Sequence, residues 1–137
     1  MKVYVTQKPL YNALCTRNIC AVTKMCGDTD IAALSANNCV LPYDAEVLLV
    51  DSSHIPNITG NGRCKHIISC GMGEKDTLTF SAIGFDRSVL CVQRDIKMSN
   101  ITLECGEFPV SYDERLSVWQ NLVLGFCEAV KPYFEGK

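Results

Sequence analysis

The chain has 137 residues, of which 47% are hydrophobic and 20% are charged, and this composition excludes a disordered, collagen-like or low-complexity protein. Its 13 Lys and Arg residues are balanced by 15 Asp and Glu residues, and a net charge of −2 argues against a basic surface for nucleic acid. A single domain over residues 1–137 is expected, because a chain of this size can bury a substantial core.

The first residues and the apolar runs bear on where the protein works. Met1 to Thr6 lack the long apolar region of a signal peptide, and no apolar stretch reaches the length of a membrane span. We therefore expect a cytoplasmic protein with neither nucleic acid nor a membrane among its partners.

In the N-terminal third, alternation of Val3 and Val5 with polar residues predicts a short strand. A helix is expected from Leu10 to about Cys26, since apolar residues recur there at helical steps: Tyr11, Cys15, Ile19, Val22 and Cys26. A second short helix is expected after the capping sequence Asp28-Thr29-Asp30, ending at Asn37-Asn38.

The middle of the chain is typical of strands. Residues 45–50 are almost wholly apolar, which predicts a strand covered on both faces, and residues 51–65 form a polar, glycine-rich loop. A strand over 66–70 ends at Gly71-Met72-Gly73. Strands over 77–83, 87–96 and 101–110 follow with short connections, which favours an antiparallel meander with Pro109 on an edge.

The last helix has the clearest pattern, and its apolar residues follow one stripe: Trp119, Leu122, Val123, Phe126, Cys127 and Val130. Ser111-x-x-Glu114 is the expected capping box, and Pro132 and Gly136 are expected to end the helix. The fold class expected is α/β with an α+β tendency. It comprises a mixed sheet with an N-terminal βα part, an antiparallel meander and a C-terminal amphipathic helix, in two layers.

Nine cysteines are an odd number in a chain large enough to fold without disulfides. Many of them stand where small apolar residues would serve, such as Cys91 and Cys127, so reduced cysteines in the core are expected.

The best candidate for chemistry is Asp51-Ser52-Ser53-His54, because ligands of open α/β sheets gather at the carboxyl ends of strands. The sequence leaves open a simpler interpretation, in which these residues only cap turns. Cys64, His66 and Cys70 lie too far apart along one strand to bind a metal together, and no phosphate-binding glycine loop is present. No cofactor and no metal are therefore expected.

From Ala45 onward, the order of features resembles the central domain of the Mur ligases, the ATP-dependent enzymes that add amino acids to peptidoglycan precursors. The corresponding features are the strand at Val47–Val50, the loop Asp51-Ser52-Ser53-His54-Ile55-Pro56, the strand ending at Gly71, the meander to Val110 and the Trp119 helix. The resemblance covers roughly residues 45–130.

Individual positions match this family only in part. Asp51 stands where the family's loop has Asn, and Asn121 keeps the second Asn of the family's helix motif, whereas Ser117 and Val118 replace its His and first Asn. The family's phosphate loop and amino-acid-binding domain have no counterpart in this chain. The resemblance therefore implies a stripped relative without ligase activity.

Two functions are open at this point. The first is a non-catalytic binding or interaction module that holds a small ligand or a protein partner, with contacts from the Asp51–Gly62 loop and the Gly71 turn. Its expected ligand-binding residues are Asp51, Ser52, Ser53, His54, Cys70 and Asn121. The alternative is a small enzyme that acts on an anionic or sugar-containing substrate through Asp51, Ser53 and His54. A homodimer through the last helix or through an edge strand is also expected, with Leu116 and Leu124 exposed on that helix.

Overall fold

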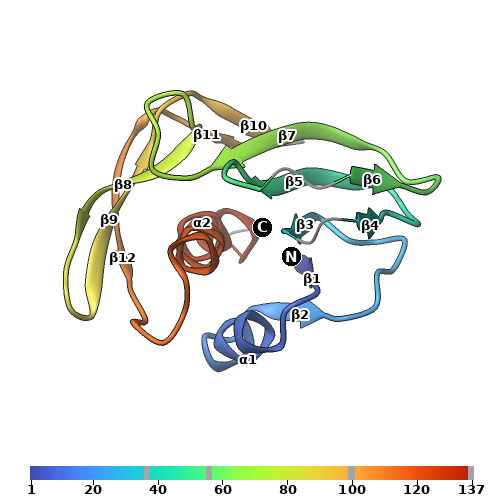
Figure 1. The fold of residues 1–137 in the computed structure, drawn as a ribbon, viewed down its shortest axis with the longest axis horizontal. Coiled ribbons are helices and arrows are strands. Elements are labelled where there is room, and N and C mark those ends of the chain that lie inside the picture. Colours follow the sequence, from blue (N-terminus) through green and yellow to red (C-terminus); the bar gives the residue numbers. More distant parts are fainter. Residues whose placement is uncertain (36–37, 55–56, 99–100, 136–137) are drawn as a thin grey trace.

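The computed structural model describes residues 1–35, 38–54, 57–98 and 101–135. Eight strands form a mixed sheet in the order β12-β9-β8-β7-β5-β3-β1-β2, which curls around the C-terminal helix (Figure 1). The elements of this sheet are β1 (Lys2–Val5), β2 (Cys20–Val22), β3 (Ile31–Leu34), β5 (Ala45–Asp51), β7 (Cys64–Cys70), β8 (Leu78–Ile83), β9 (Arg87–Val92) and β12 (Gly106–Ser111). The α/β class with a mixed sheet, predicted from the sequence, is confirmed.

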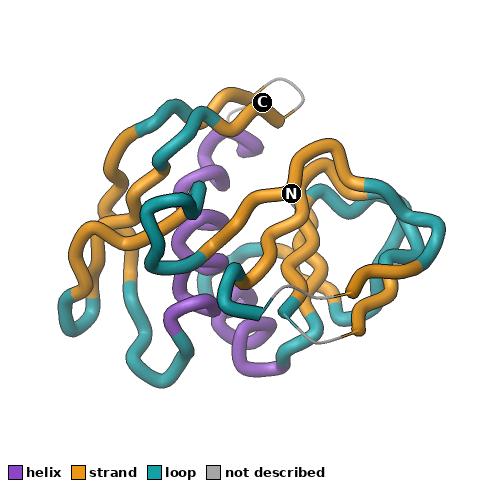
Figure 2. Tube along the Cα trace, turned by 45° about the horizontal axis from the view of Figure 1, so that its top comes forward, coloured by secondary structure: helices purple, strands orange, loops and turns teal. Residues whose placement is uncertain are grey.

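Two helices and two small sheets complete the fold. The helices are α1 (Lys8–Thr16) and α2 (Val118–Glu135). One small sheet pairs β4 (Asn38–Val40) with β6 (Asn57–Thr59), and the other pairs β10 (Ile96–Met98) with β11 (Ile101–Leu103). Figure 2 shows α2 running between the antiparallel strands and the parallel strands. Neither described helix is long and apolar enough to cross a membrane.

The parallel half of the sheet contains β5, whose apolar run determines its position. Val47 and Leu49 face the main core with both helices, whereas Leu48 and Val50 face a smaller apolar cluster beneath β4 and β6. Both faces of β5 are therefore covered, as its apolar sequence predicts. On the side of the smaller cluster, the β4–β6 pair covers the main sheet. The sequence predicts only two layers, one of helices and one of sheet.

The antiparallel half is the expected meander of β8, β9 and β12, with Pro109 in the edge strand β12. The strands predicted over 87–96 and 101–110 contribute only β9 and β12 to the main sheet. The residues between them form β10 and β11, which pair as a separate hairpin. Strand β7 joins β8 through one residue pair, Cys70 with Leu78, and the two strands diverge from there (Figure 1).

Two helix predictions in the N-terminal third are wrong. The helix starting near Leu10 ends at Thr16, because Asn18 takes a left-handed backbone conformation (φ 57°) and turns the chain into β2. The second predicted helix is strand β3, all four of whose residues are buried between β1 and β5. Its expected end at Asn37 lies outside the described residues.

Helix α2 has the predicted apolar stripe, and every residue of that stripe is buried. Its capping box is Ser117 with Gln120 rather than Ser111 with Glu114: Ser117 Oγ accepts from the Gln120 N–H at 3.1 Å, and Gln120 Oε1 accepts from the Ser117 N–H at 2.8 Å. Ser111 belongs to β12 instead. The helix passes through Pro132 to Glu135, and Gly136 lies outside the described residues.

Two leucines expected to be exposed at the last helix are buried. Leu116 and Leu124 both pack into the main core, because the curled sheet and α1 surround the helix on several sides. The apolar patch that suggested a homodimer through this helix is therefore absent from these two positions.

Candidate functional site

Three segments far apart in the sequence meet in one cleft at the carboxyl ends of β5 and β7. Asp51 and Cys70 are paired positions on these neighbouring parallel strands, so the segments that leave both strands lie side by side. The start of α2 closes the third side. We call this the Asp51 cleft. Its volume is about 360 Å³, and its lining residues are Asp51, Ser52, Ser53, Cys70, Gly71, Met72, Ser117, Val118 and Trp119.

The polar side of the cleft is organised by Asp51. Its Oδ1 accepts hydrogen bonds from the Ser53 N–H at 3.0 Å and from Ser53 Oγ at 2.7 Å. Such turns are typical of Asp, whose short side chain reaches its own backbone two residues later. Within the described part of the chain no donor reaches Asp51 Oδ2. One carboxylate oxygen of a half-buried Asp is therefore left for a ligand.

The second wall is the turn after β7, where Gly71 makes a close approach possible. A Cβ atom at this position would lie 2.2 Å from Ser52 Oγ and 2.6 Å from Asp76 Oδ2. The buried Asp76 holds this turn, since its Oδ2 accepts from the Gly73 N–H at 2.9 Å. A side chain at position 71 would therefore have to displace Ser52 Oγ or Asp76, and a second carboxylate lies directly behind the wall.

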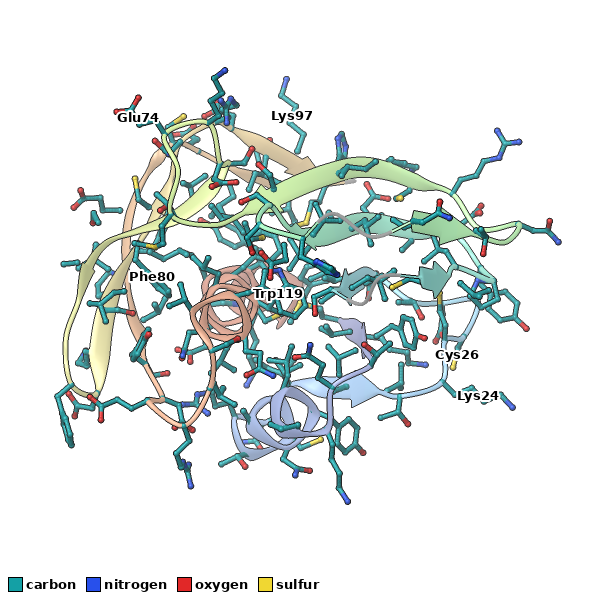
Figure 3. All side chains as sticks on the ribbon, in the orientation of Figure 1. Lys24, Cys26, Glu74, Phe80, Lys97 and Trp119 are labelled. Atoms are coloured by element: carbon teal, nitrogen blue, oxygen red, sulfur yellow. The ribbon has the colours of Figure 1, made fainter. Side chains whose placement is uncertain are left out.

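The third wall is formed by the start of α2. Trp119, labelled in Figure 3, is 6% exposed, and its indole Nε1–H is buried without a hydrogen-bond partner among the described residues. Val118 and Met72 flank the opening as exposed apolar side chains, 37% and 56% exposed respectively. The cleft thus combines polar walls with an apolar rim, which is usual for small-molecule sites.

Four of the six sequence-predicted ligand residues line this cleft: Asp51, Ser52, Ser53 and Cys70. Cys70 is fully buried, and this burial raises the pKa of its thiol well above the ordinary value, with smaller contributions from Asp76 and Asp51. Its thiol is therefore protonated at neutral pH and is a poor nucleophile.

The other two predicted residues lie elsewhere. The exposed His54 is outside the lining, and its backbone N–H donates to the Asp51 carbonyl oxygen at 3.0 Å. Asn121 is fully buried: its Oδ1 accepts from the Asp113 N–H, and its Nδ2 donates to the carbonyl oxygens of Asp113, Leu116 and Ser117. These hydrogen bonds hold the turn between Asp113 and Ser117, and this turn places Ser117 at the cleft.

The expected ligand residues omit five that line the cleft. Gly71 and Met72 belong to the Gly71 turn, which was expected to contribute contacts, whereas Ser117, Val118 and Trp119 were not expected at the site. Trp119 belongs to the apolar stripe of the helix, and that stripe gives no sign that the residue also borders a cleft. Ser117 and Val118 stand just ahead of that stripe, and the capping box expected at Ser111 and Glu114 does not mark them.

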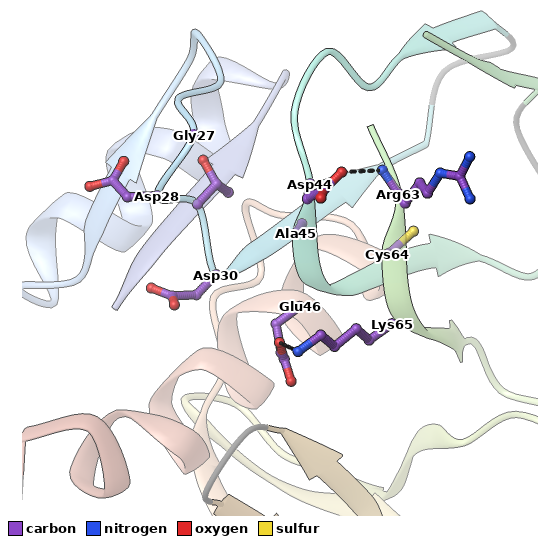
Figure 4. A pocket seen from close by; sticks show the side chains of 10 residues that line it. Gly27, Asp28, Asp30, Asp44, Ala45, Glu46, Arg63, Cys64 and Lys65 are labelled. Atoms are coloured by element: carbon purple, nitrogen blue, oxygen red, sulfur yellow. Dashed lines mark hydrogen bonds and ion pairs between the residues drawn. The ribbon is translucent and has the colours of Figure 1, made fainter. Parts of the chain in front are cut away.

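A second cleft of about 450 Å³ lies at the opposite ends of the strands, around Asp30, Asp44 and Glu46 (Figure 4). Its acidic residues are largely partnered by the protein itself. Asp44 Oδ1 accepts from the Arg63 N–H at 2.9 Å, Glu46 pairs with Lys65 at 3.4 Å, and Asp30 Oδ2 accepts from the Lys2 N–H at 2.8 Å. These contacts account for the acidic cluster as a structural feature.

Within residues 1–35, 38–54, 57–98 and 101–135, no three His, Cys, Asp or Glu side chains are placed to hold a metal ion together. All nine cysteines are free. Three of them are buried (Cys39, Cys70 and Cys127) and the others are partly or fully exposed, so the expectation of core cysteines holds only for this minority.

Comparisons with protein-family models, curated proteins and solved structures find no match for this chain.

Proposed function

We propose that this protein is a small non-catalytic binding module whose Asp51 cleft holds a small molecule. The observation that carries the proposal is the meeting of three chain segments in one cleft at the carboxyl ends of β5 and β7. Ligands of open α/β sheets bind at this edge. A turn-capping role alone explains the Asp51–Ser53 hydrogen bonds but not the exposed apolar rim that Met72 and Val118 form at the cleft.

The proposal extends to ancestry: the chain is a degenerate relative of the Mur ligase central domain that has kept a binding role. This extension rests on the order of features in residues 45–130 and on Asn121 in α2, which keeps the second Asn of the family's helix motif. Because the family's phosphate loop has no counterpart here, the proposed relative binds without ligating.

The test uses the protein as purified from cells. Native mass spectrometry should detect a retained small molecule that is lost on denaturation. Val118→Glu places a carboxylate at the rim of the cleft, where the start of a helix tolerates an acidic residue, and it should abolish retention. Tyr133→Glu makes the same change at the exposed far end of α2 and should preserve it.

A second measurement covers a molecule lost during purification. The chain has one tryptophan, so the indole N–H of Trp119 gives a single NMR signal at the cleft. Sugars, nucleosides, nucleotides and amino acids are titrated against this signal. Absence of both a retained molecule and any shift at millimolar ligand would overturn the proposal.

One contact favours a second candidate function, an enzyme acting on an anionic or sugar-containing substrate. The Ser53 hydroxyl donates to the Asp51 carboxylate at 2.7 Å, as an activated nucleophile would. The imidazole of His54 makes no described hydrogen bond to this pair, so the usual base is missing from the arrangement. Hydrolysis of nitrophenyl phosphates or glycosides that disappears in Ser53→Ala would support the enzyme, and its absence supports the binding module.

A further inference from the structure

Charge limits what the Asp51 cleft can hold. Its lining contains the Asp51 carboxylate but no Lys, Arg or His among the described residues, and the buried Asp76 carboxylate lies behind Gly71. An anionic ligand would meet two carboxylates without a cation to offset them, in surroundings where charges are screened less than in water. The electrostatics therefore disfavour phosphates and carboxylates.

The hydrogen-bonding groups of the cleft are mixed. Asp51 Oδ2 can only accept. Ser117 Oγ already accepts from the Gln120 N–H, so its own proton is available to a ligand. Ser53 Oγ uses its proton on Asp51 and can accept. Hydroxyl groups both donate and accept, and they fit such a set better than groups of one type.

The rim adds an apolar surface. Met72 and Val118 belong to different walls of the cleft, and both are exposed. A sugar ring presents C–H groups on its faces and hydroxyl groups at its edge, and methionine adapts easily to irregular apolar shapes.

From these observations we propose that the Asp51 cleft selects an uncharged sugar ring, either free or as part of a nucleoside, and discriminates against the phosphorylated form of the same molecule. This inference rests on the proposed binding function and adds the ligand class to it. Asp51 would accept from a ring hydroxyl, the Ser117 hydroxyl would donate to a ring oxygen, and Met72 and Val118 would cover one ring face.

The experiment compares matched pairs of ligands, adenosine with AMP and glucose with glucose 1-phosphate, through the single Trp119 indole signal. The uncharged member of a pair should bind at least about tenfold more tightly than its phosphate, as expected for charge repulsion across a small cleft. Asp51→Asn removes one negative charge while keeping the size of the side chain, and it should reduce this preference several-fold.

Two further variants keep the test decisive. Val118→Lys adds a cation at the rim and should shift the preference toward the phosphate, even if Asp51→Asn folds poorly. Asp44→Asn removes a carboxylate from the opposite cleft and should leave the preference unchanged.

The possible outcomes separate this inference from the proposed function. A phosphate that binds as tightly as its uncharged partner, or a preference unaffected by both cleft variants, would overturn the inference while leaving a binding cleft in place. The same holds if other small molecules shift Trp119 and neither pair does. If no small molecule shifts the signal at all, the proposed function itself has failed.

Discussion

Asp51 and Cys70 are directly paired at the carboxyl ends of two neighbouring parallel strands, and they differ sharply in exposure. The Asp51 carboxylate is half-buried, and its Oδ2 accepts no hydrogen bond from the described residues, whereas the Cys70 thiol is fully buried. One residue pair in the sheet therefore marks both the opening of the cleft and the core beneath it.

Gly71→Ala should destabilise the protein and narrow the cleft. The new methyl group would lie 2.2 Å from Ser52 Oγ and 2.6 Å from Asp76 Oδ2, so these side chains or the turn must shift. We expect a loss of about 1–3 kcal/mol in the free energy of unfolding, measured in urea. Gly27→Ala is the matched control, because its Cβ would only approach Tyr43 Cδ1 at 3.9 Å. Equal stability of the two variants would show that the turn at Gly71 relaxes freely.

Asn121→Ala should cost about 2–4 kcal/mol of stability, since it removes several buried hydrogen bonds and leaves the Asp113 N–H unpaired. Asn12→Ala, on the exposed side of α1, should change stability by less than about 0.5 kcal/mol. Urea unfolding of both variants measures the difference. A small effect at Asn121 would mean that water replaces its bonds.

Thiol labelling should divide the cysteines by burial. A short iodoacetamide pulse, followed by peptide mass spectrometry, should modify the exposed Cys15, Cys20 and Cys105 first. Cys70 and Cys127 should react only after unfolding, because burial raises the pKa of Cys127 to about 12 and that of Cys70 well above its ordinary value. Rapid labelling of Cys127 in the folded protein would contradict the packing of α2.

Stability should fall at alkaline pH through the same thiols. In the unfolded chain the Cys127 thiol ionises with its ordinary pKa of 9.0, whereas in the folded protein it stays protonated up to about pH 12. The stabilising difference is therefore fully present below about pH 9 and is lost as the pH rises toward 12. Cys127 should account for a loss of about 1 kcal/mol by about pH 10.

Comparison with a variant isolates this contribution from other alkaline effects. Cys127→Ala should show a shallower decline of unfolding free energy above about pH 9 than the wild type. Cys20→Ala, at an exposed site, should follow the wild type. Parallel declines for Cys127→Ala and the wild type would rule out a contribution from this thiol.

The sequence by itself determined the elements whose patterns are long or unambiguous. The run at 45–50 predicts a strand covered on both faces, and Val47 and Leu48 face separate apolar clusters as that pattern requires. The α2 stripe is equally clear, because its residues repeat at helical steps over three turns. Asp51, Ser52 and Ser53 could be singled out because they are the polar exit of a buried strand.

The tertiary structure decided what short apolar segments become and what the cleft contains. Ile31–Leu34 fits either a helix or a strand by composition, and burial on both faces between β1 and β5 makes it a strand. The cleft depends on the register between β5 and β7, which brings Gly71 next to Ser52. It also depends on the turn before α2, where the buried Asn121 amide donates to the Ser117 carbonyl oxygen and so places Ser117 at the cleft. Such neighbours are separated by tens of residues, and no local pattern records that they meet.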